Sequence, residues 1–262
     1  MEIQPLLNRI DKTKALIDSR RPLKPEEVKE LDAYFRIGLT YSSNALEGNT
    51  LDLTETKILL EDGLTVGGKP LRDSYEAVGH ARAYDFMLEA ARSMQFTFTE
   101  TMILQLHKLF FQKIDEEAAG VYRSVQVFIT GTEYMPPPAD EISALMKVFT
   151  DELAGKWNRE HPVRLAALAH QKLVDIHPFE DGNGRTARLL MNLILINHGY
   201  QIVSIPPILR REYIAAIEMG RRIESATGEA LTKFIAECEI EAQKDFCRMF
   251  HIKPPDKDEL AR

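Results

Sequence analysis

Residues 164–198 read RLAALAHQKLVDIHPFEDGNGRTARLLMNLILINH, and this stretch decides the fold. Apolar residues recur at helical spacing on both sides of a break that contains proline and two glycines. We therefore expect two helices, at about 164–174 and 183–198, joined by a tight loop. The second contains the most apolar stretch of the chain, Leu189 to Ile196, which is far too short to span a bilayer.

The same helical spacing continues through most of the chain outside this stretch. A short helix capped by Thr54 is expected to end at Gly63, because glycine favours the left-handed position after a helix. Strands and helices do not alternate, so the sequence predicts an all-α fold and no parallel sheet. Further helices are expected near the N-terminus and at about 25–46, 71–94, 99–114, 141–157, 211–221 and 229–250.

One segment departs from the helical pattern. Residues 121–134 read VYRSVQVFITGTEY, which is rich in β-branched and aromatic residues and carries Gly131 at a turn position. Three prolines at 136–138 end the segment. This composition predicts a short β-hairpin over 121–135.

Composition limits the classes of protein to which the chain can belong. It has 262 residues, 44% of them hydrophobic and 28% charged, which is ordinary for a globular protein. A net charge of −7 disfavours non-specific binding of nucleic acid, which needs a basic surface. Cys238 and Cys247 lie nine residues apart on a predicted helix, so they do not face each other and match no metal spacing. The first residues, MEIQPLLNRIDKTK, are charged and unlike a signal peptide. We expect a cytoplasmic protein without membrane spans.

The loop at the centre of the quoted stretch has the features of an anion site. Gly182-Asn183-Gly184 opens the apolar helix, and the amide groups of a first helical turn have no partner within the helix. The helix dipole adds partial positive charge there, which suits phosphate groups. Arg185 and Arg188 lie three residues apart and share a helix face, from which both guanidinium groups can grip phosphates.

Two further residues add reactive chemistry to this anion site. Asp181 lies at its rim, and a carboxylate beside phosphates indicates a shared Mg²⁺ ion. His177 precedes the turn, and a neutral imidazole can accept a proton from a hydroxyl group near pH 7. The sequence therefore predicts a site that transfers a nucleotide phosphate to a hydroxyl group.

Other interpretations of the same residues fit less well. The pattern at 182–187 matches a loose dinucleotide motif, but that motif needs a βαβ unit and an acidic residue about 20 positions on, where Ser204 and Ile205 stand. A Walker A loop is absent. Three histidines have spacings that match no standard zinc pattern: His161, His170 and His177.

The string HPFEDGNGRTAR at 177–188 resembles the Fic-domain signature, HPFx[DE]GNGRxxR, at every specified position. The similarity covers roughly Leu31 to Glu241. It implies an all-helical Fic core with a β-hairpin flap. It also implies transfer of AMP from ATP to a Ser, Thr or Tyr hydroxyl of a target protein, with release of pyrophosphate.

The resemblance assigns a role to each residue of the loop. His177 corresponds to the general base and Asp181 to the Mg²⁺ ligand. A phosphorylating branch of the family carries lysine at the position of Gly184, so glycine there favours AMP transfer. The positions that it assigns to ATP are Asp181, Gly182, Asn183, Gly184, Arg185 and Arg188, the last holding the terminal phosphate.

A second segment, SNALEGN at 43–49, resembles the inhibitory motif of the family, [ST]-x-x-x-E-[GN]. Ser43 and Glu47 lie four residues apart on one helix face. A negative charge near a helix C-terminus is disfavoured by the helix dipole, so Glu47 needs a cationic partner. The resemblance names Arg188 as this partner. We therefore expect Glu47 to act as a brake that withholds Arg188 from ATP.

The resemblance also extends to the hairpin and the nucleotide pocket. An exposed strand edge is expected to pair with the target protein, and the hairpin tip is expected to contact ATP. Tyr213 corresponds to a residue that contacts adenine, whereas Arg221 departs from the asparagine of similar chains. By the same analogy, residues 1–46 are expected to form a homodimer. The tip residues are Thr130, Gly131, Thr132 and Glu133.

The resemblance divides the chain into an N-terminal helical region with the inhibitory helix (1–70), a Fic core (71–250) and a tail (251–262). Two alternative functions stay open. The same site can remove AMP from a modified protein if Glu47 positions a water molecule for attack. The chain can also be a nucleotide-binding regulatory module without catalysis, although no chemical position of the loop is degraded.

Overall fold

A computed structural model of the chain describes residues 2–65, 67–93, 97–155, 159–222 and 228–253. Within these ranges the chain is helical and contains no strand, so the predicted all-α fold is confirmed. The α-helices are α1 (Ile3–Ser19), α2 (Pro25–Ala45), α3 (Leu53–Asp62), α4 (Leu71–Arg92), α5 (Glu100–Phe111), α6 (Ile142–Ala154), α7 (Pro162–Ile176), α8 (Asn183–Asn197), α9 (Arg210–Arg222) and α10 (Glu229–Met249).

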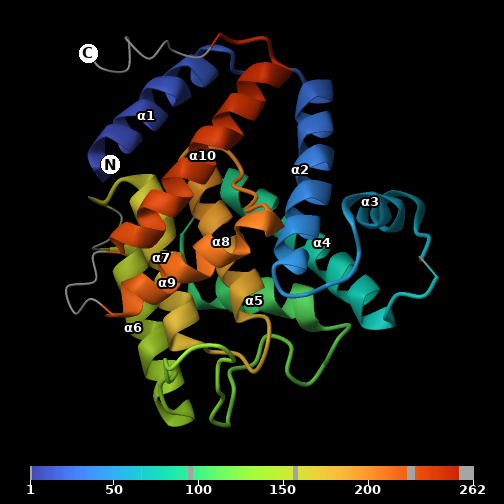
Figure 1. The fold of residues 1–262 in the computed structure, drawn as a ribbon, viewed down its shortest axis with the longest axis vertical. Helices are drawn as coiled ribbons and strands as arrows, with labels where there is room; N and C mark the ends of the chain where they lie inside the picture. Colours follow the sequence, from blue (N-terminus) through green and yellow to red (C-terminus); the bar gives the residue numbers. More distant parts are fainter. Residues whose placement is uncertain (1, 66, 94–96, 156–158, 223–227, 254–262) are drawn as a thin grey trace.

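Helix α8 forms the centre of the core. It packs along α7 and α4, and α10 lies across α7 and α9 (Figure 1). Every residue of α8 from Arg185 to Leu195 is buried, polar ones included. A helix that is apolar on nearly all sides has to be covered by other helices, which accounts for this burial. The loop before α8 is thereby fixed to the most rigid part of the molecule.

The N-terminal helices cover this core from outside. Helix α1 packs along α10, and α2 packs on α4 with α3 beyond it (Figure 1). The buried residues of α2 all lie in its second half, from Phe35 onward. The C-terminal half of α2 is therefore held by the core, and its N-terminal half extends away from it.

Helix α3 starts two residues earlier than a cap at Thr54 would allow. The N-cap is Asp52, whose carboxylate accepts from Glu55 N at 2.8 Å, while the Glu55 carboxylate accepts from Asp52 N at 2.8 Å. This reciprocal capping box satisfies two amide groups that have no helical partner. The predicted end at Gly63 is confirmed, since Gly63 is left-handed with φ of 70°.

The hairpin predicted over 121–135 is not formed as paired strands, and this expectation was wrong. The segment is extended, with a turn at Thr130 and Gly131. Side chains replace the strand ladder: the Arg123 guanidinium donates to Val125 O and Pro137 O, at 2.9 and 2.6 Å. The three prolines at 136–138, which follow this segment, have no amide hydrogen and cannot extend a strand ladder.

Three further expectations concern the two cysteines, membrane-spanning helices and the C-terminal tail. Cys238 and Cys247 are free thiols, as their spacing predicted. No helix in the described part of the chain combines the length and apolar character needed to cross a membrane. The predicted tail, 251–262, lies outside the described residues from 254 onward.

Candidate active site

The loop between α7 and α8 reverses the chain through two left-handed residues. His177 ends α7 with φ of 51°, and Gly182 precedes α8 with φ of 79°. A side chain at Gly182 is excluded twice, by this φ angle and because its Cβ would lie 2.8 Å from the Phe110 ring. The tight turn therefore depends on glycine at this position.

Two polar side chains hold the backbone of this loop in place. Asn183 accepts from Phe179 N at 2.9 Å and donates to Phe179 O at 2.8 Å, which uses its whole amide group. Arg123 donates from Nε to His177 O at 2.8 Å, and its own amide donates to Pro178 O at 2.9 Å. The Asn183 side chain thus closes the loop, so at this residue only the backbone is free to face an anion.

His107 supports the same loop from α5. Its Nδ1 accepts from Gly120 N at 2.9 Å, so Nε2 carries the proton and donates to Asp181 O at 3.0 Å. Its ring stacks on Phe179 with centroids 3.7 Å apart. Burial lowers the pKa of His107 to about 4, so the ring stays neutral and this tautomer is fixed.

His177 presents a free ring nitrogen at the mouth of the loop. Its Nδ1 lies 3.2 Å from Val174 O, which requires the proton on Nδ1 and leaves Nε2 as an acceptor. Partial burial lowers the pKa of His177 below its ordinary 6.5, and the cations Arg123 and Arg221 act in the same direction. Near pH 7 the imidazole is therefore neutral and able to accept a proton.

Asp181 lies in the same loop, four residues after His177, and its carboxylate is half exposed. Arg72 donates to Oδ2 at 2.6 Å, and Arg185 and the Gly182 amide contact Oδ1 at 3.2 and 2.6 Å. Burial raises the pKa of Asp181, but Arg185, the amide and Arg72 outweigh it and lower the pKa below its usual value. The group is thus an ionised carboxylate whose outer oxygen is held by the exposed Arg72 side chain.

The first arginine of the loop, Arg185, is engaged inside the protein. Its guanidinium pairs with Glu76 at 3.0 Å and lies over the Phe110 ring, 4.4 Å from the centroid. Glu76 is a buried carboxylate on α4 that also contacts Arg72 and Asn49. Arg185 therefore fixes the inner side of the site, with its other nitrogen directed to Asp181.

The second arginine, Arg188, is almost completely buried and is bound on three sides. Its Nε donates to Ser43 Oγ at 2.9 Å, and Nη2 donates to Ser43 O and to Glu47 Oε1, both at 2.8 Å. Its Nη1 donates to the Tyr213 hydroxyl at 3.2 Å. The structure thus brings Ser43, Glu47 and Arg188 together, and the expected partners are in direct contact.

Glu47 lies just past the end of α2, with its carboxylate over the first turn of α8. A Cβ at Gly184 would collide with Glu47 Oε1, so only glycine lets the carboxylate come this close. Desolvation raises the pKa of Glu47, but Arg188 and Arg185 outweigh it and lower the pKa. An ionised carboxylate therefore occupies the anion site that the sequence predicts for phosphate.

Tyr213 is buried beside Arg188. Only 3% of the residue is exposed, and its hydroxyl accepts from Arg188 and bonds to His170 Nε2 at 2.8 Å. Its ring packs near Phe234. This placement differs from the expected contact with adenine, because a stacking residue has to offer a free ring face. In this structure Tyr213 is a partner of Arg188.

The turn at 130–133 lies against α9. Thr132 donates to Glu218 Oε2 at 2.8 Å, and the Arg221 guanidinium lies 4.2 Å from the centroid of the Tyr134 ring. Arg221 also donates to Val174 O, the carbonyl that His177 Nδ1 contacts. An open cavity adjoins this turn, lined by Gly131, Thr132, Glu133, Tyr134, Glu218 and Arg221.

The sequence reasoning assigned no role to three residues that shape the site. Arg123 is buried in a segment of strand-like composition, and a single arginine among β-branched residues was the available signal. Arg72 and Glu76 are four apart on α4, a spacing that is ordinarily a solvent-exposed pair. Their contacts with Asp181 and Arg185 depend on the packing of α4 against α8, which no local pattern reveals.

The described residues contain no group of three or more His, Cys, Asp or Glu side chains that could hold a metal ion. The histidines with unusual spacing are separated: His161 pairs with Asp11 at 3.0 Å, and His170 with Tyr213. The dinucleotide interpretation also fails here, since the described ranges contain no βαβ unit.

Comparisons with known proteins agree with this geometry. The model of the Fic/DOC family matches residues 97–195. Protein adenylyltransferase Fic from Drosophila willistoni is 36% identical over 208 residues, which are 79% of this chain and 40% of the relative. The chain thus spans about 40% of the length of that curated relative.

Two solved structures share the fold. A Fic domain containing signaling protein from Bacteroides thetaiotaomicron has a TM-score of 0.81 and 30% identity, covering 90% of this chain and 95% of that one. Fic-1 from C. elegans, in a solved fragment, has a TM-score of 0.83 and 28% identity, covering 96% and 74%. The similarity therefore extends over almost the whole chain.

Proposed function

Because the chain belongs to the Fic/DOC family, we propose that it is an autoinhibited protein adenylyltransferase. It transfers AMP from ATP to a Ser, Thr or Tyr hydroxyl group of a target protein. The relatives named protein adenylyltransferase Fic support this activity. The observation that carries the proposal is the free Nε2 of a neutral His177 beside the N-terminus of α8, where Arg185 and Arg188 converge.

The reaction follows from this arrangement. The hydroxyl oxygen of the target attacks the α-phosphorus of ATP, and its proton passes to His177 Nε2. The bond between the α-phosphorus and the bridging oxygen breaks, and pyrophosphate leaves with both bonding electrons. The amide groups of the first turn of α8 and the two arginines stabilise the negative charge of the leaving group.

Asp181 is suited to hold Mg²⁺ in this reaction. Its carboxylate is ionised, half exposed and adjacent to the N-terminus of α8. One carboxylate together with phosphate oxygens and water molecules is a common environment for Mg²⁺. A bound Mg²⁺ ion would neutralise phosphate charge. Arg72 now holds Oδ2, so it has to release that oxygen when the ion binds.

Autoinhibition is supported by the contacts of Arg188. With Ser43, Glu47 and Tyr213 as partners, the guanidinium is not free to bind a terminal phosphate. The Glu47 carboxylate also carries the same sign of charge as that phosphate and lies over Gly184. ATP can therefore bind productively only after Glu47 moves away from α8.

Residues 121–135 are proposed to hold the target protein. The segment is extended and forms no strand ladder, so its backbone can form main-chain hydrogen bonds with a target segment. Its exposed apolar side chains offer contacts beside the site: Val121, Val125, Phe128 and Met135. The expected homodimer through residues 1–46 stays a prediction.

Incubation with Mg²⁺ and α-labelled ATP tests the proposal. The Glu47→Gly variant should incorporate label and release pyrophosphate at least about tenfold faster than the wild type, since each 1.4 kcal/mol of lost restraint is tenfold. Glu61→Gly is the matched control, because Glu61 is an exposed glutamate at the end of α3. Adding His177→Ala to Glu47→Gly should abolish transfer. Equal incorporation with and without His177 would refute its role as the base, and no incorporation by Glu47→Gly would favour a binding module.

One observation favours removal of AMP as a second activity. Glu47 Oε1 is bound to Arg188, whereas Oε2 has no side-chain hydrogen bond within the described part of the chain, and the side chain is 36% exposed. This free oxygen can orient a water molecule for attack. Release of AMP from an adenylylated target by the wild type, and its loss in Glu47→Gly, would establish this direction.

A further inference from the structure

Four charged side chains form a closed ring around the carboxylate proposed for Mg²⁺. Arg72 donates from Nε to Glu76 Oε1 at 3.1 Å and from Nη2 to Asp181 Oδ2 at 2.6 Å. Arg185 closes the ring, with Nη1 3.0 Å from Glu76 Oε1 and Nη2 3.2 Å from Asp181 Oδ1. Each oxygen of Asp181 is therefore held by one arginine. Two positive and two negative charges balance, so the protein itself supplies the countercharge of Asp181.

The two arginines of this ring differ in their freedom to move. The Arg185 side chain is 4% exposed and lies over the Phe110 ring, whereas the Arg72 side chain is 56% exposed. Asp181, at 45%, shares the exposed side of the ring with Arg72. Moving Arg185 would take a partner from the buried Glu76 carboxylate, which is strongly unfavourable. Arg72 is therefore the member of the ring that can release Asp181 and turn toward solvent.

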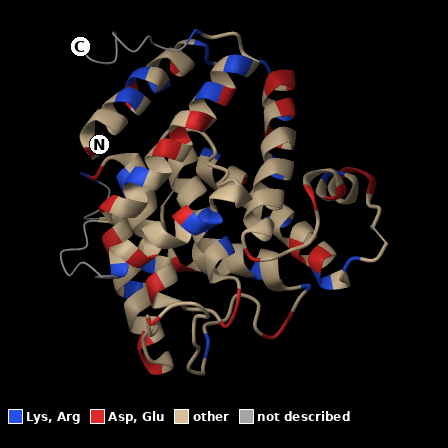
Figure 2. Ribbon diagram, in the orientation of Figure 1, with Lys and Arg blue, Asp and Glu red and all other residues tan. Residues whose placement is uncertain are grey.

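The position of Arg72 in α4 is unfavourable for the helix itself. Arg72 is the second residue of α4, which starts at Leu71. A positive charge in the first turn of a helix is opposed by the helix dipole. Acidic and basic residues lie side by side at the start of α4 (Figure 2). Because Glu76 and Asp181 offset the effect of the dipole, the site accounts for an arginine here and the stability of the helix does not.

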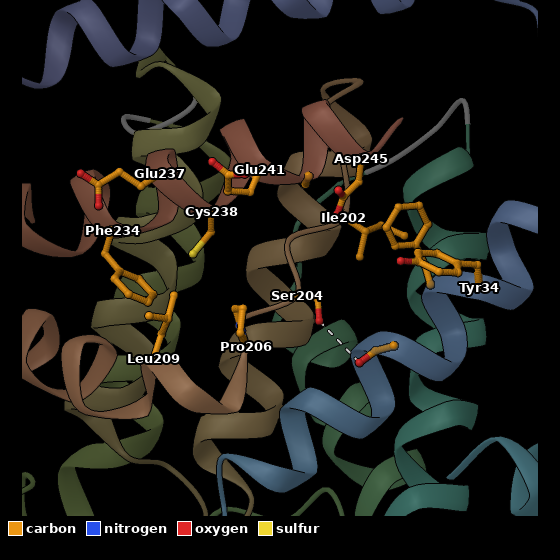
Figure 3. A pocket seen from close by; sticks show the side chains of 13 residues that line it. Tyr34, Ile202, Ser204, Pro206, Leu209, Phe234, Glu237, Cys238, Glu241 and Asp245 are labelled. Atoms are coloured by element: carbon orange, nitrogen blue, oxygen red, sulfur yellow. Dashed lines mark hydrogen bonds between the residues drawn. The ribbon is translucent and has the colours of Figure 1, made fainter. Parts of the chain in front are cut away.

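Helix α2, which ends in the inhibitory motif, is held separately from behind. Ser204 points at α2 from the chain after α8 (Figure 3), and its Oγ lies 2.7 Å from Ser42 Oγ. Arg72, in contrast, reaches the site from α4 through an exposed side chain. Release of Asp181 by Arg72 therefore needs no movement of α2, and it is a restraint distinct from the brake on Arg188.

We propose that Arg72 is an internal competitor for the divalent cation at Asp181 and sets the metal concentration at which the site is loaded. Its guanidinium is the countercharge of Asp181 until a divalent ion takes that place, and the side chain then turns outward. Because the two cations share one carboxylate, the ion pair lowers the apparent affinity for the metal by mass action. The inference rests on the proposed function, since the divalent ion is the one that accompanies ATP.

Titration with Mn²⁺ in the presence of α,β-methylene ATP, followed by electron paramagnetic resonance, measures metal affinity without turnover. The Glu47→Gly protein is the background, because its site is open to the nucleotide. Adding Arg72→Gln should lower the Mn²⁺ dissociation constant at least about threefold, as expected for the loss of one exposed ion pair with Asp181. Arg92→Gln is the matched control and should change it less than about 1.5-fold. Arg92 lies on the same helix, is 50% exposed and pairs with Asp32 at 2.6 Å.

Two further variants separate competition from a structural effect. Arg72→Lys keeps the positive charge and should stay within about twofold of the background. Asp181→Asn should remove the effect of Arg72→Gln, because the carboxylate for which the cations compete is gone. With EDTA in place of Mn²⁺, Arg72→Gln should bind the nucleotide analogue no more tightly than the background, since it has lost a positive charge beside the phosphates.

Equal Mn²⁺ affinities with and without Arg72→Gln would overturn the competition, as would tighter binding in Arg72→Gln that survives Asp181→Asn. Failure of the proposed function shows itself differently, as equal AMP transfer by Glu47→Gly and the wild type, whatever the metal affinities.

Discussion

Removal of one hydroxyl group, in Ser43→Ala, should release a measurable part of the brake. Ser43 Oγ accepts from Arg188 Nε at 2.9 Å, and both side chains are almost completely buried. A hydrogen bond to a charged group contributes about 1.5–3 kcal/mol. If this bond exists only while Arg188 is held, its loss raises the population of the released state roughly 10- to 150-fold, since 1.4 kcal/mol is tenfold.

The assay is initial-rate incorporation of α-labelled ATP, with Ser19→Ala as the control. Ser19 is exposed at the end of α1, and its hydroxyl bonds only to Leu16 O, so the control rate should stay within about twofold. In a Glu47→Gly background, where Arg188 is already released, Ser43→Ala should add less than about threefold. A Ser43→Ala protein that folds normally and transfers AMP at the wild-type rate would refute this role of Arg188.

Three more outcomes follow from the structure. Asn183→Ala leaves the Phe179 amide and carbonyl without their bonds, so the free energy of unfolding should fall by about 2–4 kcal/mol in urea titrations; a loss below ~1 kcal/mol would contradict the loop closure. The pKa of His177 is lowered below 6.5, so the rate of Glu47→Gly should be constant between about pH 7 and 8 and fall only in more acidic buffer; a decline that begins above pH 7 would argue against this base. Burial raises the pKa of Glu239 from 4.5 to about 8, so its contribution to stability is complete below 4.5 and is lost as the pH rises toward 8. Glu239→Gln can still accept from Gln201 N, and its Tm should therefore vary less with pH than that of the wild type; equal pH dependence of the two would exclude Glu239 as the cause.

The helices could be predicted because their signals are local. Helix α8 is apolar from Leu189 to Ile196, and such a segment becomes helical and buried whatever packs on it. Gly63 likewise ends α3 through a backbone preference of the residue itself. The start of α3 was missed by two residues, since Asp52 and Thr54 are both good caps and only Asp52 forms the reciprocal pair with Glu55.

The hairpin shows why a local signal can fail. Residues 121–134 have strand-forming composition, but composition does not supply a paired partner, and the prolines that follow at 136–138 have no amide hydrogen to extend a ladder. Arg123 instead holds the carbonyls of both arms and the carbonyl of His177. No local pattern shows that one arginine will bind the carbonyls of Val125, Pro137 and His177 together.

For the loop at 177–188, the sequence by itself determined the types of group and their order. Residues 177–188 carry the imidazole, the carboxylate, the glycine turn and the two arginines. Because so few residues separate these groups, they stay close together in any fold that keeps α8. That information is local, and it was enough to predict a phosphate site before any tertiary contact was known.

The resemblance to the Fic family named Glu47 as a partner of Arg188, but only the tertiary structure decided the other contacts of the two arginines. Arg185 pairs with Glu76, and Arg188 with Ser43, Glu47 and Tyr213, through residues 25 to 145 positions distant in the chain. The C-terminal end of α2 has to pack against α8 before the contacts of Arg188 with Ser43 and Glu47 can form. A buried guanidinium takes the acceptors that the surrounding helices supply, and those depend on the packing of the whole chain.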